Sequence, residues 1–133
     1  MTRIESKTQP LPFGIEKVFA FLNDCNNLQL LMPPEVSNWQ STASQCSFTI
    51  KGMATLGMKI AETTPPSQVK ILREGKGPFD FILYCNLSDS GDQKSVIQLI
   101  FDADLNPMLK MMAVKPLTNF LNILTENLSK QNL

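Results

Sequence analysis

The chain has 133 residues, of which 43% are hydrophobic and 18% are charged. This composition is typical of a globular domain and argues against disorder. Twelve basic side chains balance twelve acidic ones, so there is no net field to attract a polyanion such as DNA, RNA or an anionic membrane surface. We therefore predict a single domain over residues 1–133 and no nucleic-acid partner.

Targeting signals and chemically reactive residues are few. The segment 1–7 lacks the apolar core of a secretory signal, and no stretch approaches the roughly 20 apolar residues that span a bilayer. We expect a cytoplasmic protein without a membrane span. Cys25, Cys46 and Cys85 are widely spaced, which favours reduced core thiols over a disulfide framework or a zinc site. The chain has no histidine, which excludes Ser-His-Asp and Cys-His arrangements; we expect no metal and no cofactor.

The N-terminal third predicts one strand and two short helices. Residues 2–8 alternate between charged and small or apolar side chains, as in a half-buried strand, and the proline-rich segment 10–12 is expected to end it. Apolar residues recur at helical spacing over 15–22, which predicts an amphipathic helix. Segment 25–34 predicts a second short helix or a turn that ends at Pro33.

The middle of the chain predicts strands separated by short turns. Six strands are expected, over 38–43, 46–51, 54–63, 68–74, 79–88 and 94–104. The links contain turn residues, at Gly52, 64–67, 75–78 and 89–92. Because parallel pairs need long crossovers, links this short make neighbouring strands antiparallel.

The C-terminal segment predicts one long helix. Asn106 is a candidate N-cap, and Pro107 suits the first helical position. Apolar residues then form a single stripe, which needs a concave partner surface, and the sheet is the candidate partner. Pro116 inside this helix removes a hydrogen bond, so we expect a kink near Lys115.

This order of elements, with the segments Val18–Asp24 and Leu31–Pro33 and the closing helix, resembles the START-like (SRPBCC, Bet v 1-like) superfamily. The segments Asn38–Thr42, Phe48–Ala54 and Ala103–Met108 further resemble a small bacterial, Bacteroidetes-type subgroup. The resemblance implies the α+β helix-grip fold: a seven-stranded curved antiparallel sheet wrapped around the C-terminal helix, with two short helices between strands 1 and 2. It also implies a hydrophobic molecule held between sheet and helix. A minority of such proteins are enzymes, and no catalytic position is carried over to this chain.

Strand alternation assigns side chains to the face that such a cavity would use. The expected ligand-facing residues are Trp39, Phe48, Met58, Phe81, Leu83, Leu99, Phe101, Met108, Met112 and Phe120. Ser6 and Thr8 are the expected polar anchors. The apolar residues fit a solidly packed core equally well, because cores contain the same residue types. Arg73 either points inward near the end of its strand or is freed by a turn at Gly75.

The leading functional hypothesis is a non-catalytic binder or carrier of a lipid, isoprenoid or aromatic molecule. A polyketide cyclase or dehydratase-like enzyme is the first alternative; it requires an ionisable group such as Asp80, Arg73 or Glu74 inside the cavity. A protein-interaction module of the Hsp90-activator type is the second. The outer face of the predicted sheet carries Val96 and Ile100, so a monomer and a homodimer both remain open.

Overall fold

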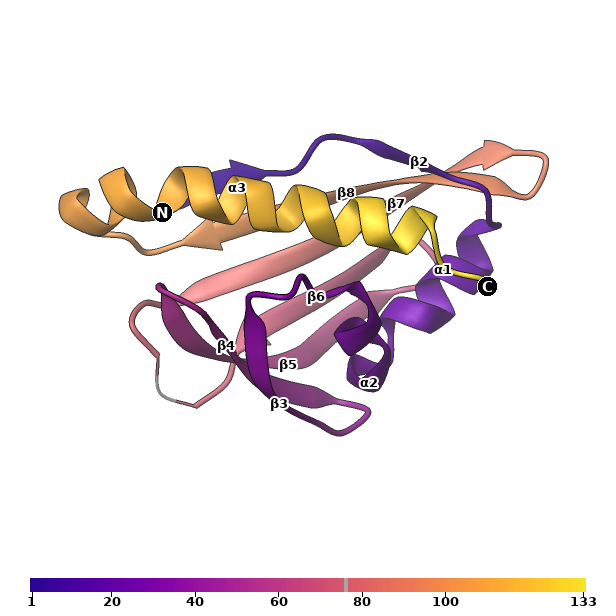
Figure 1. The fold of residues 1–133 in the computed structure, drawn as a ribbon. Helices are drawn as coiled ribbons and strands as arrows, with labels where there is room; N and C mark the ends of the chain where they lie inside the picture. Colours follow the sequence, from indigo (N-terminus) through magenta and orange to yellow (C-terminus); the bar gives the residue numbers. More distant parts are fainter. Residues whose placement is uncertain (76) are drawn as a thin grey trace.

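The computed structural model describes residues 1–75 and 77–133, and within them an antiparallel sheet of eight strands curves around one long helix (Figure 1). The strands are β1 (Thr2–Glu5), β2 (Gln9–Leu11), β3 (Val36–Ser41), β4 (Gln45–Ile50), β5 (Ala54–Thr64), β6 (Gln68–Arg73), β7 (Phe81–Gly91) and β8 (Lys94–Ala103). The helices are α1 (Ile15–Leu22), α2 (Cys25–Leu28), the 3-10 turn η1 (Gln29–Leu31) and α3 (Pro107–Ser129). This is the predicted α+β helix-grip architecture. Lys76, inside the turn predicted over 75–78, lies outside the described residues.

The sheet is ordered β1-β8-β7-β6-β5-β4-β3, and β2 also pairs with β8. The prediction of seven strands is one short because the first strand is divided. β1 and β2 are separate segments on β8, with residues 6–8 between them. Pro10 does not end the strand as expected but pairs with Val96. A proline is tolerated there because β2 is an edge strand, where the missing N–H faces no neighbour.

The concave face of the sheet carries the apolar set that the alternation predicts. Leu83 pairs with Phe101 and Cys85 pairs with Leu99 across β7 and β8, and all four side chains are buried. The ring centroids of Phe81 and Phe101 lie 4.8 Å apart. Burying this face against α3 removes several large side chains from water, at roughly 1.5–3 kcal/mol each, which is the main stabilising contribution to the fold.

Helix α3 begins where the sequence predicts. The Asn106 side chain accepts a hydrogen bond from the backbone N–H of Leu109 at 2.9 Å, and Pro107 occupies the first turn. The helix continues past Pro116 to Ser129; the kink expected near Lys115 stays a prediction.

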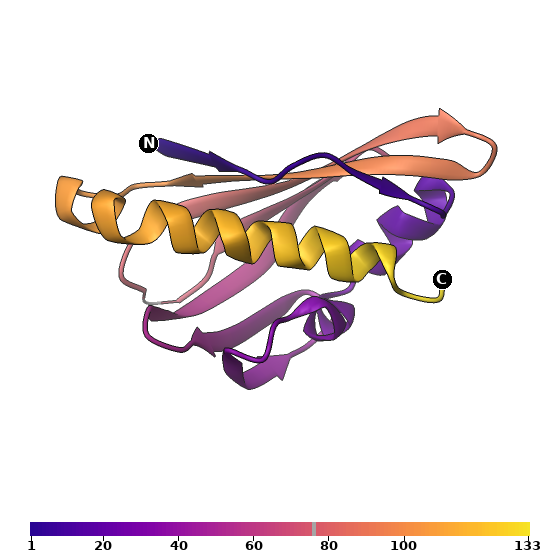
Figure 2. The ribbon, with the colours of Figure 1, turned by 45° about the horizontal axis from the view of Figure 1, so that its top comes forward.

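Polar contacts along its second half hold α3 against two separate parts of the chain. The Asn122 side chain accepts a hydrogen bond from the backbone N–H of Lys7 at 2.8 Å. The Asn127 amide donates to the Leu31 carbonyl, also at 2.8 Å. The helices α1 and α2 lie near this C-terminal end of α3 (Figure 2). The first turns of α3 instead project past the end of the sheet (Figure 1).

Candidate ligand-binding site

A groove of about 400 Å³ lies between α3 and the edge of the sheet that carries β3. One wall comes from the segment after η1 and from the β4–β5 turn: Pro33, Glu35, Ile50, Lys51, Gly52 and Met53. The other wall is one face of α3: Leu109, Met112, Ala113, Pro116, Asn119, Phe120 and Ile123. Apolar side chains dominate the α3 wall, and the other wall combines Pro33, Ile50 and Met53 with the charged Glu35 and Lys51. The volume lies in the range of small-molecule sites, about 300–1,000 Å³.

Local backbone geometry builds the wall that faces α3. The β4–β5 turn places Gly52 at a φ of 77°, a left-handed conformation that favours glycine because it has no Cβ. The backbone N–H of Lys51 donates to the Glu35 carbonyl at 2.9 Å, which joins the turn to the segment leading into β3. The two segments at the open end of the β3–β4 hairpin therefore form one continuous wall.

The face of α3 in the groove follows from helical periodicity. Met112, Pro116, Asn119 and Ile123 recur at spacings of three and four residues, which places them above one another on one side of a helix. Met112 is 68% exposed, and Pro116 and Asn119 are exposed as well. This face is not covered by the sheet, unlike the buried stripe that contains Leu117, Leu121 and Leu124.

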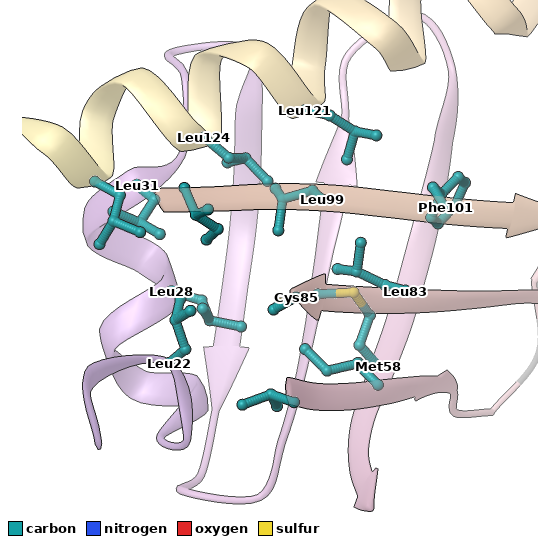
Figure 3. Packing of buried hydrophobic residues seen from close by; sticks show 14 of the residues in the cluster. Leu22, Leu28, Leu31, Met58, Leu83, Cys85, Leu99, Phe101, Leu121 and Leu124 are labelled. Carbon is teal, nitrogen blue, oxygen red and sulfur yellow. The ribbon is translucent and has the colours of Figure 1, made fainter. Parts of the chain in front are cut away.

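Behind the groove, the interior contains two small voids rather than one large cavity. A void of about 30 Å³ lies among Leu22, Leu31, Ile71, Leu99 and Leu128, and one of about 20 Å³ lies among Phe48, Leu56, Phe101 and Leu117. Met32, Met58, Leu83 and Leu124 line both. Figure 3 shows Leu121 and Leu124 of α3 pointing toward Leu83 and Leu99 of the sheet. Each void has room for only one or two waters and offers almost no polar partner, so neither holds a ligand as it stands.

Phe120 lies between the groove and the interior. Its side chain lines the groove and also the smaller void. Its ring is stacked at 6.4 Å, centroid to centroid, on the ring of Phe48 in β4. Phe120 is therefore the described residue that the groove and this void share.

The structure distributes the predicted ligand-facing residues among several places. Phe48, Met58, Leu83, Leu99 and Phe101 line the inner voids. Met112 and Phe120 line the groove. Phe81 is buried among other aromatic rings, and Met108 is 72% exposed on the projecting first turn of α3. Met108 and Met112 therefore do not face Met58, which is buried in the sheet.

Trp39 reaches the apolar layer through a β-bulge. The register of β3 against β4 shifts between Ser37 and Gln40, and Asn38 has a positive φ of 56°. The Trp39 ring stacks on Phe48 with centroids 5.3 Å apart. Its indole N–H donates to the Ser41 hydroxyl at 2.9 Å.

The two predicted polar anchors lie at the opposite edge of the sheet from the groove. Ser6 is buried; its hydroxyl donates to the Lys7 carbonyl and accepts from the backbone N–H of Leu99, each at 2.9 Å. These hydrogen bonds satisfy backbone groups in the gap between β1 and β2. Thr8 is exposed in the same division.

Charged groups and thiols have no arrangement typical of catalysis in the described residues. Arg73 forms an ion pair with Asp80 at 3.2 Å at the end of β6, with both side chains partly in solvent. Burial raises the pKa of Cys85 to about 12, and a hydrogen bond with Cys25, together with burial, raises the pKa of Cys46. Both thiols are therefore neutral and poor nucleophiles at neutral pH. Residues 1–75 and 77–133 contain no cluster of three or more Cys, Asp or Glu side chains able to hold a metal.

Several solved structures are similar to this chain over almost its whole length. A protein from Thermus thermophilus is 13% identical, with a TM-score of 0.78 over 97% of this chain and 95% of that chain. A START superfamily protein from Mycobacterium smegmatis is 14% identical, with a TM-score of 0.69 over 96% and 97%. A norcoclaurine synthase point mutant from Thalictrum flavum, in complex with a transition state analogue, is 12% identical, with a TM-score of 0.74 over 97% and 92%. The chain has the helix-grip fold of the START-like proteins.

The resemblance seen in the sequence is thus confirmed at the level of fold, and the bacterial subgroup stays a prediction. At these identities, the likeness to solved structures extends to the fold alone. No family model and no curated protein matches the chain. In the part of the chain that the structure describes, no helix combines the length and apolar character needed to cross a bilayer.

Within this helix-grip fold, most of the groove could not be predicted from the sequence. Glu35, Lys51 and Met53 lie at the open end of the β3–β4 hairpin, and no local pattern indicates that this end lies across from α3. Asn119 and Ile123 could have been found, since they continue the helical spacing of Met112 and Pro116. The groove therefore combines a helix face that the sequence encodes with an opposite wall that only folding assembles.

Proposed function

We propose that the protein binds or carries a hydrophobic small molecule, of lipid, isoprenoid or aromatic type, in the groove between α3 and the β4–β5 turn. The observation that carries the proposal is the groove itself, about 400 Å³ with mainly apolar walls. Exposed apolar surface of this kind is costly to leave in water and is a common property of ligand sites.

A second hollow on the surface has polar walls and therefore suits an apolar ligand less well than the groove does. It encloses about 440 Å³ beside Gln40, Thr42, Gln45 and Glu74, which are polar and exposed. An apolar molecule gains little from such walls, because burying polar groups without partners is unfavourable. The groove along α3 is the better site for the proposed ligand.

The inner voids supply a route to a deeper site. Phe120 separates the groove from the smaller void, and Met32 lines both voids. Methionine side chains adapt their shape readily. A ligand larger than the groove would extend beneath α3 as Phe120 and Met32 shift, which suits a carrier of extended apolar molecules.

The enzyme alternative draws on a different observation. A neighbour of the same fold is norcoclaurine synthase, an enzyme, and Glu35 and Lys51 line the mouth of the groove in this chain. The structure shows no ion pair between these two side chains, and both are exposed. Side chains in contact with solvent are not enclosed with a substrate, which favours binding over acid-base chemistry.

Binding of 1-anilinonaphthalene-8-sulfonate, followed by its fluorescence, tests the proposal. Asn119→Trp should fill the groove and weaken binding at least about tenfold, because the indole would occupy the space of the probe. Lys115→Trp adds the same side chain at an exposed position of α3 outside the groove and should leave binding unchanged. Equal binding by the wild type and both variants would refute the groove as the site.

A further inference from the structure

Helix α3 contains a backbone acceptor without its helical donor. In an α-helix, each carbonyl accepts a hydrogen bond from the N–H four residues later. Residue 116 is a proline inside the helix, and proline has no N–H. The carbonyl of Met112 therefore lacks its usual partner, and among the described residues no side chain donates a hydrogen bond to it.

Helix geometry places this carbonyl on the side of α3 that lines the groove. A helical carbonyl points along the axis toward the residue four positions ahead, so the Met112 oxygen lies between the Met112 and Pro116 side chains. Both side chains line the groove. The acceptor is thus part of a wall whose other groups are mainly apolar.

A complementary polar group lies one turn further along the same wall. Asn119 is exposed and lines the groove, and its side-chain amide makes no hydrogen bond within the part of the chain that the structure describes. The wall therefore offers an acceptor at the Met112 carbonyl and a donor at the Asn119 amide. A hydroxyl group can use both, since it donates one hydrogen bond and accepts others.

We propose that the ligand of the groove is an alcohol or a phenol, with its hydroxyl donating to the Met112 carbonyl and accepting from Asn119. This assignment rests on the proposed function and adds the chemical class of the ligand. The charges in the groove also favour a neutral polar group on the ligand, because Glu35 and Lys51 carry opposite charges. Pro116 is then a specificity-determining residue, which acts by leaving the carbonyl free.

Two matched probes, 2-naphthol and 2-methoxynaphthalene, test the assignment by titration calorimetry. They share an apolar body, and only the naphthol can donate a hydrogen bond. The wild type should bind 2-naphthol about two- to tenfold more tightly, the range that one net hydrogen bond supplies. Pro116→Ala restores an N–H to the Met112 carbonyl and should reduce this ratio to about one. Loss of the proline ring alters the fit of both probes alike, so the ratio reports the hydrogen bond.

Pro107→Ala is the matched control. Pro107 is in the first turn of α3, where a restored N–H meets no helical carbonyl, so the naphthol preference should persist. Both variants should stay folded, since alanine favours helix more than proline does. A wild-type ratio of one, or an unchanged ratio in Pro116→Ala, would overturn the alcohol assignment while the groove stays a binding site. Absence of binding by both probes and by 1-anilinonaphthalene-8-sulfonate would overturn the proposed function itself.

Discussion

Gly57 shows how tightly the backbones of the sheet pack at the residue scale. Its carbonyl accepts a hydrogen bond from the Glu74 N–H at 2.9 Å, just past the end of β6. A Cβ atom at this position would overlap the Glu74 carbonyl oxygen, which is backbone and cannot rotate away. Glycine is required here by close approach rather than by an unusual φ.

Gly57→Ala should therefore destabilise the protein by about 2–3 kcal/mol, in the range of overpacking substitutions. The measurement is the free energy of unfolding from urea titration. Gly77→Ala is the control, because the nearest atom to its added Cβ belongs to a flexible Arg73 side chain at 3.6 Å; it should change stability by less than about 0.5 kcal/mol. Equal losses for both variants would contradict the close approach at Gly57.

The Cys85 thiol makes stability depend on alkaline pH. Burial raises its pKa to about 12 in the fold, whereas a thiol in the unfolded chain has a pKa of about 8.5. Between these values the unfolded chain releases a proton that the folded chain retains. Stability is therefore fully present below about pH 8.5 and is lost as the pH rises toward about 12, at most about 1.4 kcal/mol for each pH unit.

Comparison with Cys85→Ala isolates this effect. The variant lacks the titrating group, so its unfolding free energy should fall less steeply between about pH 9 and 11 than that of the wild type. Its lower absolute stability does not matter, because the slope is the quantity compared. Identical slopes would show that Cys85 ionises as easily in the fold as in the unfolded chain.

At the scale of elements, the start of α3 depends on its N-cap residue, Asn106. Its first turns project past the sheet (Figure 1), and Met108 and Met111 are 72% and 88% exposed. Tertiary packing therefore contributes little to this end of the helix. The hydrogen bond to the Asn106 side chain supplies a local start.

Asn106→Ala should weaken this end, at a cost of about 1 kcal/mol in unfolding free energy. Hydrogen exchange should also quicken for the amides of 109–111, because the cap orders the first turn. Asn106→Asp is the matched variant, since its carboxylate accepts the same bond and favours the helix N-terminus. Unchanged exchange in Asn106→Ala would mean that packing, not the cap, orders the turn.

At the scale of the whole molecule, the sheet packs so closely against α3 that little empty space is left in the interior. The two inner voids measure about 30 and 20 Å³, whereas the groove at the surface measures about 400 Å³. Leu83 lines both voids (Figure 3). Its side chain therefore lies between them, together with those of Met32, Met58 and Leu124.

Leu83→Ala should join the voids into one apolar cavity. We expect a loss of about 2–5 kcal/mol in unfolding free energy and a partial recovery when benzene is added, because apolar cavities stay dry and accept such ligands. Leu87→Ala is the control: Leu87 is also buried on β7 but lines neither void. It should lose similar stability and recover less with benzene. Equal recovery would argue against a joined cavity.

The predictable part of the fold rests on local rules. Alternation assigned Leu83, Phe101 and their neighbours to the buried face because successive side chains of a strand point to opposite faces. Asn106 and Pro107 marked the start of α3 because cap chemistry acts within one turn. The division of the first strand was missed, since Pro10 carries the same local signal in a turn and in an edge strand.

The sequence by itself determined the order of elements, the apolar face of the sheet and the helix stripe, because these follow from interactions within a few residues. Only the tertiary structure decided where the open space lies. The groove needs the end of the β3–β4 hairpin to lie across from α3, a segment far along the chain, and the inner voids depend on how side-chain volumes fill the space between sheet and helix. Neither quantity is encoded in a local pattern, so the sequence did not reveal that most of the predicted ligand-facing side chains lie in a packed interior and that the open groove runs along α3.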